Sequence, residues 1–229
     1  MESTLKKNIR GFVFDIDGTL LNTLPEIAIS VNSVLEKYRL NPHPVEAYRG
    51  FVGKGVEHLV QKAFQISTSN TDFKAILADV MEQYTQNIGK YSSLFPGIQE
   101  LIRSIADKSY PIGVCSNKPQ ELAEQSVSRF FPHQTIFPVI GASNDHPLKP
   151  EPWGLEYISK EWGLPPSEIV FFGDSVVDIH TAKACGTFSA AVSWGFCNPT
   201  RLAKHKPDFL FDNVQNILEH FSLAPRSQL

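Results

Sequence analysis

The chain has 229 residues, with 21 lysines and arginines against 24 aspartates and glutamates, so its formal net charge is −3 at pH 7. Without a basic excess there is no positive field to attract nucleic acid, and no apolar run approaches the length that spans a bilayer, so we expect neither nucleic acid nor a membrane as partner. The length allows one domain with a substantial core and a modest second one.

The first predicted element is a buried strand that runs into Val13-Phe14-Asp15-Ile16-Asp17-Gly18-Thr19-Leu20. An apolar run that breaks into a glycine indicates a strand whose carboxyl end opens onto a crevice, the usual place for ligands in α/β sheets. Asp15 and Asp17 lie at that end. Taken alone, this pair is also compatible with a simple turn, because Asp and Gly are common in loops.

From about residue 23 to residue 92 the spacing of apolar residues is helical. Thr23-Leu24-Pro25-Glu26 is typical of a capping box that opens the first helix. Three apolar stripes follow, at Ile27, Val31, Val34, Leu35 and Tyr38, at Val56, Leu59, Val60 and Phe64, and at Phe73, Ile76, Leu77, Val80 and Tyr84. We therefore predict a small helical lid, residues 23–92, inserted into a core formed by residues 1–22 and 93–229.

From Phe95 onward, strand-like and helical stretches alternate. We predict helices at about 97–107, 120–130, 153–162, 176–184 and 214–221, and strands at about 111–115, 137–140, 169–172, 188–192 and 209–211. This βα alternation predicts an α/β fold with a doubly wound, mainly parallel sheet. We expect residues 224–229 to form a frayed tail.

A second acidic pattern follows the apolar run Ile169-Val170-Phe171-Phe172, as Gly173-Asp174-Ser175 and then Asp178. If a helix begins after the glycine, Asp174 lies at its start and Asp178 is on the same side one turn later. Carboxylates in one partly dry crevice raise each other's pKa, and a divalent cation with oxygen ligands, such as Mg²⁺, removes that conflict. We interpret the acids as a metal site; the alternative is two unrelated surface loops.

Two further polar segments fit the same edge of the sheet. The strand-like run from Pro111 ends in Ser116-Asn117-Lys118, which offers a hydroxyl, an amide and backbone N–H groups to an anion such as phosphate. Lys149 lies in Leu148-Lys149-Pro150-Glu151-Pro152, where two prolines restrict the direction of its ammonium group. We expect Ser116 and Lys149 to be functional and Lys118 to lie at the surface.

The cysteines and the N-terminus indicate the cellular compartment. Cys115, Cys185 and Cys197 are an odd number without metal-ligand spacing, and the first two fall in apolar segments, which favours reduced, buried thiols. The stretch Met1–Lys7 leads into the first strand without the apolar core of a signal peptide. We therefore expect a soluble, cytoplasmic protein.

Taken in order, Asp15-Ile16-Asp17-Gly18-Thr19-Leu20, Ser116, Lys149 and Gly173-Asp174-Ser175 with Asp178 resemble the four signature motifs of the haloacid dehalogenase (HAD) superfamily. The resemblance covers nearly the whole chain. Within the superfamily the chain is most similar to the phosphoglycolate phosphatase branch, through the spacing of the motifs, Phe51-Val52-Gly53-Lys54-Gly55 and Val192-Ser193-Trp194-Gly195-Phe196. It implies a HAD-like core with a helical cap of the C1 type between the first and second motifs.

The resemblance also implies a role for each motif residue. Asp15 would be the nucleophile that forms an aspartyl-phosphate, and Asp17 the general acid and then the base. Mg²⁺ would be held by the Asp15 side chain, the Asp17 carbonyl and Asp174, with Asp178 in the surrounding hydrogen-bond network. The groups implied to bind the phosphoryl group or offset its charge are Gly18, Thr19, Ser116, Asn117 and Lys149.

The predicted function is a Mg²⁺-dependent phosphomonoester hydrolase for a small phosphorylated metabolite, with 2-phosphoglycolate as the first candidate. Lys54, presented by Gly53 and Gly55, would meet the substrate carboxylate, with Arg49 and His58 beside it; the alternative is a flexible connector with a solvated lysine. Asn22 stands where many relatives carry Asp, and we expect catalysis to tolerate this change.

Several alternatives remain open from the sequence. Relatives implied by the resemblance include sugar phosphate phosphatases, pyrophosphatases and phosphosugar mutases. A phospho-accepting signalling module is the non-enzymatic alternative, although Asp17 and a lid of about seventy residues argue against it. The chain is compatible with a monomer or a homodimer.

Overall fold

The computed structural model describes residues 9–223, so the predictions for Met1–Lys7 and for the tail at 224–229 lie outside the described residues. The 3₁₀ helices are labelled η. In chain order the elements are β1 (Gly11–Phe14), β2 (Leu21–Asn22), α2 (Leu24–Lys37), η1 (Val45–Gly50), α3 (Val56–Phe64), α4 (Phe73–Asn87), β3 (Ser93–Leu94), α5 (Ile98–Asp107), β4 (Ile112–Pro119), α6 (Gln120–Phe130), β5 (Val139–Ala142), α7 (Trp153–Trp162), η2 (Pro166–Glu168), β6 (Ile169–Gly173), α8 (Val176–Cys185), β7 (Phe188–Val192), α9 (Pro199–Lys204), β8 (Phe209–Phe211) and α10 (Val214–His220).

The centre of the fold is a six-stranded sheet in the order β5-β4-β1-β6-β7-β8. All of its neighbouring strands are parallel, and Phe14 of β1 lies opposite Val114 of β4 and Phe172 of β6. The predicted doubly wound, parallel α/β sheet is therefore confirmed. Because the chain leaves β1 toward β4 on one side and β6 lies on the other, the carboxyl ends of these three strands are adjacent, where such sheets bind ligands.

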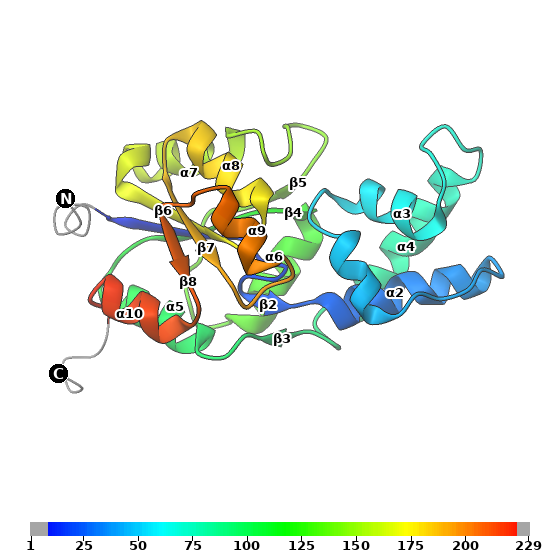
Figure 1. Ribbon diagram of the computed structural model, residues 1–229, viewed down its shortest axis with the longest axis horizontal. Coiled ribbons are helices and arrows are strands. Elements are labelled where there is room, and N and C mark those ends of the chain that lie inside the picture. Colours follow the sequence, from blue (N-terminus) through cyan, green and yellow to red (C-terminus); the bar gives the residue numbers. More distant parts are fainter. Residues whose placement is uncertain (1–8, 224–229) are drawn as a thin grey trace.

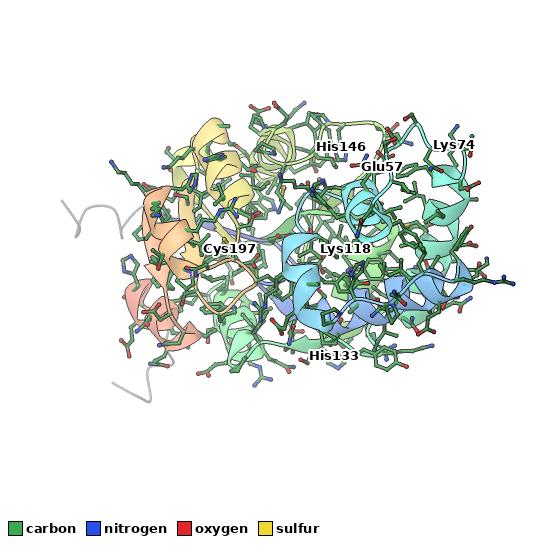
Figure 2. All side chains as sticks on the ribbon, turned by 45° about the vertical axis from the view of Figure 1, so that its right-hand side comes forward. Glu57, Lys74, Lys118, His133, His146 and Cys197 are labelled. Carbon is green, nitrogen blue, oxygen red and sulfur yellow. The ribbon has the colours of Figure 1, made fainter. Side chains whose placement is uncertain are left out.

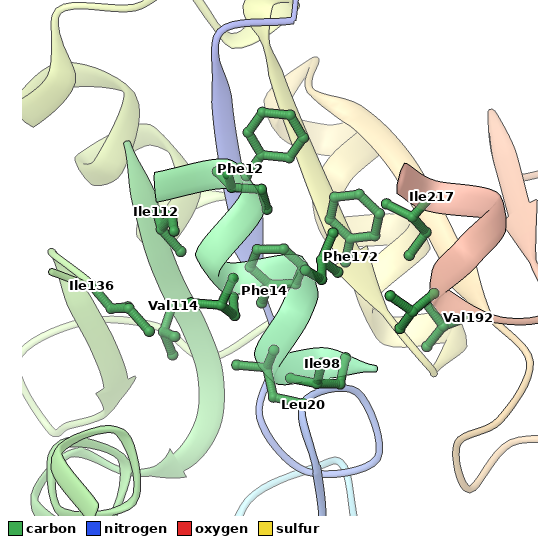
Figure 3. Close-up of a cluster of buried hydrophobic side chains, with 14 of the residues drawn as sticks. Phe12, Phe14, Leu20, Ile98, Ile112, Val114, Ile136, Phe172, Val192 and Ile217 are labelled. Carbon is green, nitrogen blue, oxygen red and sulfur yellow. The ribbon is translucent and has the colours of Figure 1, made fainter. Parts of the chain in front are cut away.

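The sheet is buried on both faces, and its central strands β1 and β6 are apolar at every position. Phe12 and Phe14 of β1 and Phe172 of β6 pack with α5 and α10, as Figure 3 shows, and the rings of Phe14 and Phe172 stack with centroids 4.8 Å apart. Val13 and Phe171 point to the opposite face, under α7 and α8. Figure 1 shows these two helical layers on either side of the sheet.

The helices α2, η1, α3 and α4 form a group beside the sheet, at the right of Figure 1, which we call the helical unit (residues 24–87). It has its own apolar core, built from the three predicted stripes together with Tyr48 of η1. Two connecting segments join it to the rest of the chain. They lie side by side in the antiparallel pair β2–β3, in which Leu21 pairs with Leu94 and Asn22 with Ser93.

The predicted capping box at the start of α2 is wrong. Thr23 has φ −97° and ψ −3°, whereas a capping residue needs an extended backbone to direct its side chain to the N–H groups of the first turn. Its buried hydroxyl has no hydrogen-bond partner among residues 9–223. The Glu26 carboxylate instead accepts a hydrogen bond, at 3.5 Å, from the backbone N–H of Tyr91 in the segment that connects α4 to β3.

The remaining differences from the predicted elements are small. The strand predicted at 137–140 begins at Val139, because Pro138 has no N–H for the ladder with β4. The short strands β2 and β3 and the helix α9 were not predicted. Within the described residues, every helix is too short or too polar to cross a membrane.

Candidate active site

Three buried aspartates from two strand ends converge at the carboxyl edge of the sheet. Asp15 follows β1, Asp174 follows β6, and Asp178 lies in the first turn of α8. One carboxylate oxygen from each lies within 4.8 Å of the others, so the group could hold a metal ion. Lys149 joins them, with its Nζ 2.6 Å from Asp178 Oδ1 and 3.1 Å from Asp15 Oδ2.

Two glycines and a helix cap determine where Asp174 and Asp178 lie. Gly18, at φ +86°, and Gly195 both pack directly on the Asp174 side chain, and a Cβ atom at either position would overlap it. The backbone N–H of Phe196 donates to Asp174 Oδ2 at 2.6 Å. Asp178 is held by the start of α8, because its carboxylate accepts bonds from the backbone N–H and hydroxyl of Ser175. The residues Gly18, Gly195 and Ser175 therefore fix the acids from outside the cluster.

Burial and mutual repulsion disturb the ionisation of these acids. Burial raises the pKa of Asp15 to about 6, although the nearby Lys149 ammonium opposes the shift. Burial, followed by the charges of Asp178 and Asp15, raises the pKa of Asp174 well above its usual value. Burial alone would lower the pKa of Lys149, but Asp15 and Asp178 hold it above its ordinary range.

The donor set fits a hard divalent cation. Fully ionised, Asp15, Asp174 and Asp178 carry three negative charges, and Lys149 offsets only one of them. Carboxylate oxygens are the ligands that Mg²⁺ prefers, and a dication would compensate the remaining charge in this buried place.

The segment after Cys115 lies beside the acids, as expected. Ser116 donates a hydrogen bond to the Asp15 carboxylate, which lowers the pKa of that group. The Asn117 side chain joins two loops: its Oδ1 accepts from Lys149 N at 2.9 Å, and its Nδ2 donates to Lys149 O at 3.0 Å. The same Nδ2 also reaches Gly53 O, at 3.1 Å, in the helical unit. Asn117 thus fixes backbone positions around the site.

A cavity of about 490 Å³ lies between the helical unit and this edge of the sheet. Asp15, Asp17, Asp174, Ser116 and Asn117 line its base. Its other walls carry several basic side chains, contributed by Arg49, Lys54, His58 and Lys62 of the helical unit and by Arg201 of α9. The cavity is therefore acidic where the carboxylates converge and basic along its other walls.

Some of the predicted site residues lie behind this cavity. Gly18 supports Asp174, and Thr19 is buried, with its carbonyl accepting from Trp194 Nε1 at 3.1 Å. Lys149 is buried, does not line the cavity and contacts Asp15 and Asp178. Gly53 and Lys54 do line the cavity, and the backbone at Gly53 and Gly55 has φ of +98° and +88°, which favours glycine.

The expectation that Lys118 lies at the surface is wrong. Its side chain is completely buried, and its Nζ lies 3.1 Å from Asp17 Oδ1. The cause is that β4 continues to Pro119, so Lys118 lies within a strand, with its ammonium group between Asp17 and Tyr84 of α4, and not in an exposed turn. Tyr84, Phe196 and Arg201 also belong to the site and were not predicted from motifs.

Comparison with known proteins agrees with this geometry. The family model described as "Haloacid dehalogenase-like hydrolase" matches residues 12–192 of this chain. Phosphoglycolate phosphatases of Haemophilus influenzae (strain 86-028NP) and Pasteurella multocida (strain Pm70) are 28% and 29% identical over 212 residues, which is 90% of this chain and 95% of each relative.

A crystal structure described as a predicted phosphoglycolate phosphatase from Haemophilus somnus 129PT has 27% sequence identity and a TM-score of 0.84. The match covers 93% of this chain and 98% of that one. The fold thus agrees with that structure over almost the full length of both chains. The chain belongs to the haloacid dehalogenase-like hydrolases, and within them it is an enzyme related to the phosphoglycolate phosphatases.

Proposed function

We propose that the protein is a Mg²⁺-dependent phosphomonoester hydrolase that works through an aspartyl-phosphate on Asp15. The observation that carries the proposal is the cluster of Asp15, Asp174 and Asp178 with Lys149, in which Asp15 and Asp174 line a cavity large enough for a small metabolite. In phosphoryl transfer, catalysis depends mainly on positioning and on stabilising charge, and this cluster supplies both.

The side chains support a two-step reaction. In the first step a carboxylate oxygen of Asp15 attacks phosphorus, the bond from phosphorus to the ester oxygen breaks, and Asp17 donates a proton to the departing alcohol. In the second step Asp17 takes a proton from water as that water attacks the phosphorus of the aspartyl-phosphate. Inorganic phosphate leaves and the Asp15 carboxylate is restored.

The other residues position the reacting groups and balance their charge. Ser116, which already donates to Asp15, would hold a phosphoryl oxygen, and Lys149 would offset the charge on Asp15. Mg²⁺, held by the Asp15 and Asp174 side chains and the Asp17 carbonyl, would supply neutralisation of the phosphate charge. Asp178 would maintain the positions of Lys149 and of the start of α8.

For the substrate we propose 2-phosphoglycolate, with the helical unit and its two connections, residues 23–92, acting as a cap. The basic side chains that line the cavity opposite the acids would attract a second anionic group besides the phosphate. Lys54 is exposed between Gly53 and Gly55 and is our candidate for the carboxylate. The relatives named phosphoglycolate phosphatases support the same choice.

The test is phosphate release with Mg²⁺ from 2-phosphoglycolate and from 2-hydroxyethyl phosphate, which replaces the carboxylate by a neutral CH₂OH group. We expect Asp15→Asn to abolish release from both. Lys54→Met should raise the KM for 2-phosphoglycolate by about tenfold and leave that for 2-hydroxyethyl phosphate within about twofold, since a charged contact contributes about 1.5 kcal/mol or more.

Lys74→Met is the matched control, because Lys74 is exposed on α4 and does not line the cavity. Figure 2 shows it at the right-hand edge of the molecule. Full turnover by Asp15→Asn would contradict the assigned nucleophile. Sugar phosphates and pyrophosphate belong in the same screen. Faster release from one of these would reassign the substrate, and exchange of phosphate between sugar positions without release would indicate a mutase.

A further inference from the structure

Lys118 occupies an unusual place for a lysine, at the junction between the sheet and the helical unit. Its side chain is completely buried, and Figure 2 shows it in the middle of the molecule. A buried ammonium group is costly unless it has charged or hydrogen-bonding partners. The partners of Lys118 therefore indicate the role of this residue.

These partners come from both parts of the molecule. On the sheet side, Lys118 Nζ lies 3.1 Å from Asp17 Oδ1, and the Asp17 side chain lines the cavity. On the side of the helical unit, Nζ donates a hydrogen bond to the hydroxyl of Tyr84 in α4, and it lies 4.3 Å from the centre of that ring. One ammonium group thus links the acid that faces the substrate to a helix of the helical unit.

A second acid of the helical unit contributes to the same environment. Glu26 of α2 is 1% exposed and attracts Lys118 electrostatically. Its Oε1 has no hydrogen-bond partner within residues 9–223. Lys118 is therefore paired with Asp17 in the core and attracted by the charge of Glu26 in the helical unit, while Tyr84 accepts one of its hydrogens.

We propose that Lys118 is a positioning residue for Asp17, and that Tyr84 makes this positioning depend on the seated helical unit. When α4 lies against the sheet edge, Tyr84 fixes the Lys118 ammonium, which in turn holds the Asp17 carboxylate toward the cavity. Movement of α4 away from the sheet removes one of the two groups that fix Lys118. The Asp17 carboxylate is then oriented toward the substrate only when the helical unit is seated on the edge of the sheet. This inference rests on the proposed hydrolysis.

The experiment compares two small substrates with different leaving groups. The alkoxide formed from 2-phosphoglycolate is strongly basic and needs a proton from Asp17, whereas acetyl phosphate releases weakly basic acetate and needs none. The value of kcat/KM reports the steps up to formation of the aspartyl-phosphate. A positioned general acid contributes about 10²- to 10⁴-fold, so its misplacement is measurable.

We expect Lys118→Met to lower kcat/KM for 2-phosphoglycolate by about 30-fold or more and for acetyl phosphate by less than about threefold. Tyr84→Phe keeps the ring and removes the hydroxyl, and it should give the same selective loss, with a fall of about threefold to tenfold on 2-phosphoglycolate. Two controls remove equivalent groups within the helical unit: Tyr38→Phe and Lys37→Met, whose side chains both bind Asp79. Neither should change the ratio between substrates.

An equal loss on both substrates would show that Lys118 has only a structural role and would overturn the proposal. So would a Tyr84→Phe protein that behaves like Tyr38→Phe. If Lys118→Met does not fold, Tyr84→Phe decides the question alone, because the phenylalanine preserves the packing. If the unmodified protein releases phosphate from neither substrate, the proposed function itself fails, a result that is distinct from a wrong role for Lys118.

Discussion

Replacing Asp174 by Asn tests the electrostatics of the acidic cluster without relying on activity. Asn has nearly the shape of Asp, and its side-chain oxygen can still accept the bond from Phe196 N. The substitution removes one of three carboxylates that lie within 4.8 Å of each other in a buried place. With EDTA present, we expect the variant to be more stable than the unmodified protein at neutral pH.

The size of the effect follows from charge and proton binding. Two unit charges 4.8 Å apart repel by about 3.5 kcal/mol at an effective dielectric constant of 20. Because this repulsion and burial raise the pKa of Asp174, the native protein retains a proton that the unfolded chain releases above the ordinary pKa of 3.8. The stability due to Asp174 is then complete below pH 3.8 and is lost as pH rises, by about 1.4 kcal/mol per pH unit.

Urea unfolding in EDTA at pH 5, 6 and 7 measures this difference. The free energy of unfolding of Asp174→Asn, minus that of the unmodified protein, should grow as the pH rises above 3.8, by at most about 1.4 kcal/mol per pH unit. Asp107→Asn is the control, because Asp107 is exposed at the end of α5. A difference independent of pH would refute the reasoning. Added Mg²⁺ should stabilise the unmodified protein and not Asp174→Asn.

Three further predictions follow from packing and burial. Gly195→Ala should displace Asp174, because its Cβ would overlap that side chain, and isothermal calorimetry should then show at least about tenfold weaker Mg²⁺ binding. Burial raises the pKa of the Cys115 thiol to about 12, so iodoacetamide at pH 8 should label half-buried Cys197 first, as read by peptide mass spectrometry. Leu101→Ala should lower the free energy of unfolding in urea by about 2–5 kcal/mol, because Leu101 is fully buried in the main core.

The sheet could be predicted because its strands are short, apolar and separated by amphipathic helices. The helices α6 and α7 begin and end at the predicted residues, since the prolines before each one and Gly163 after α7 mark their limits. The strands β2 and β3 have two residues each and carry no periodic pattern. They arise only because the two connections of the helical unit are brought together, which is a tertiary effect.

The acids could be predicted for a similar reason, and Lys118 could not. Asp15 and Asp174 follow apolar strands that turn out to be neighbours, so the topology brings them together. The environment of Lys118 depends on Tyr84, 34 residues earlier on a separate helix, and on a β4 that continues past Cys115. Lysine is mostly exposed in folded proteins, so the sequence predicts a surface position for Lys118. Its burial results from the contact between α4 and the end of β4.

The way the helical unit meets the core links substrate enclosure to order in the site. Its two connections pair over only two residues each, so they restrain its orientation weakly. The polar bonds that seat it end on groups next to the acids: Gly53 O on Asn117, Tyr84 on Lys118, and Arg49 on Gly195 O. Each of these core residues in turn fixes Lys149, Asp17 or Asp174. We therefore expect seating of the unit and alignment of the acids to be coupled, so that a ligand that bridges the basic cavity wall and the acidic base favours the aligned state.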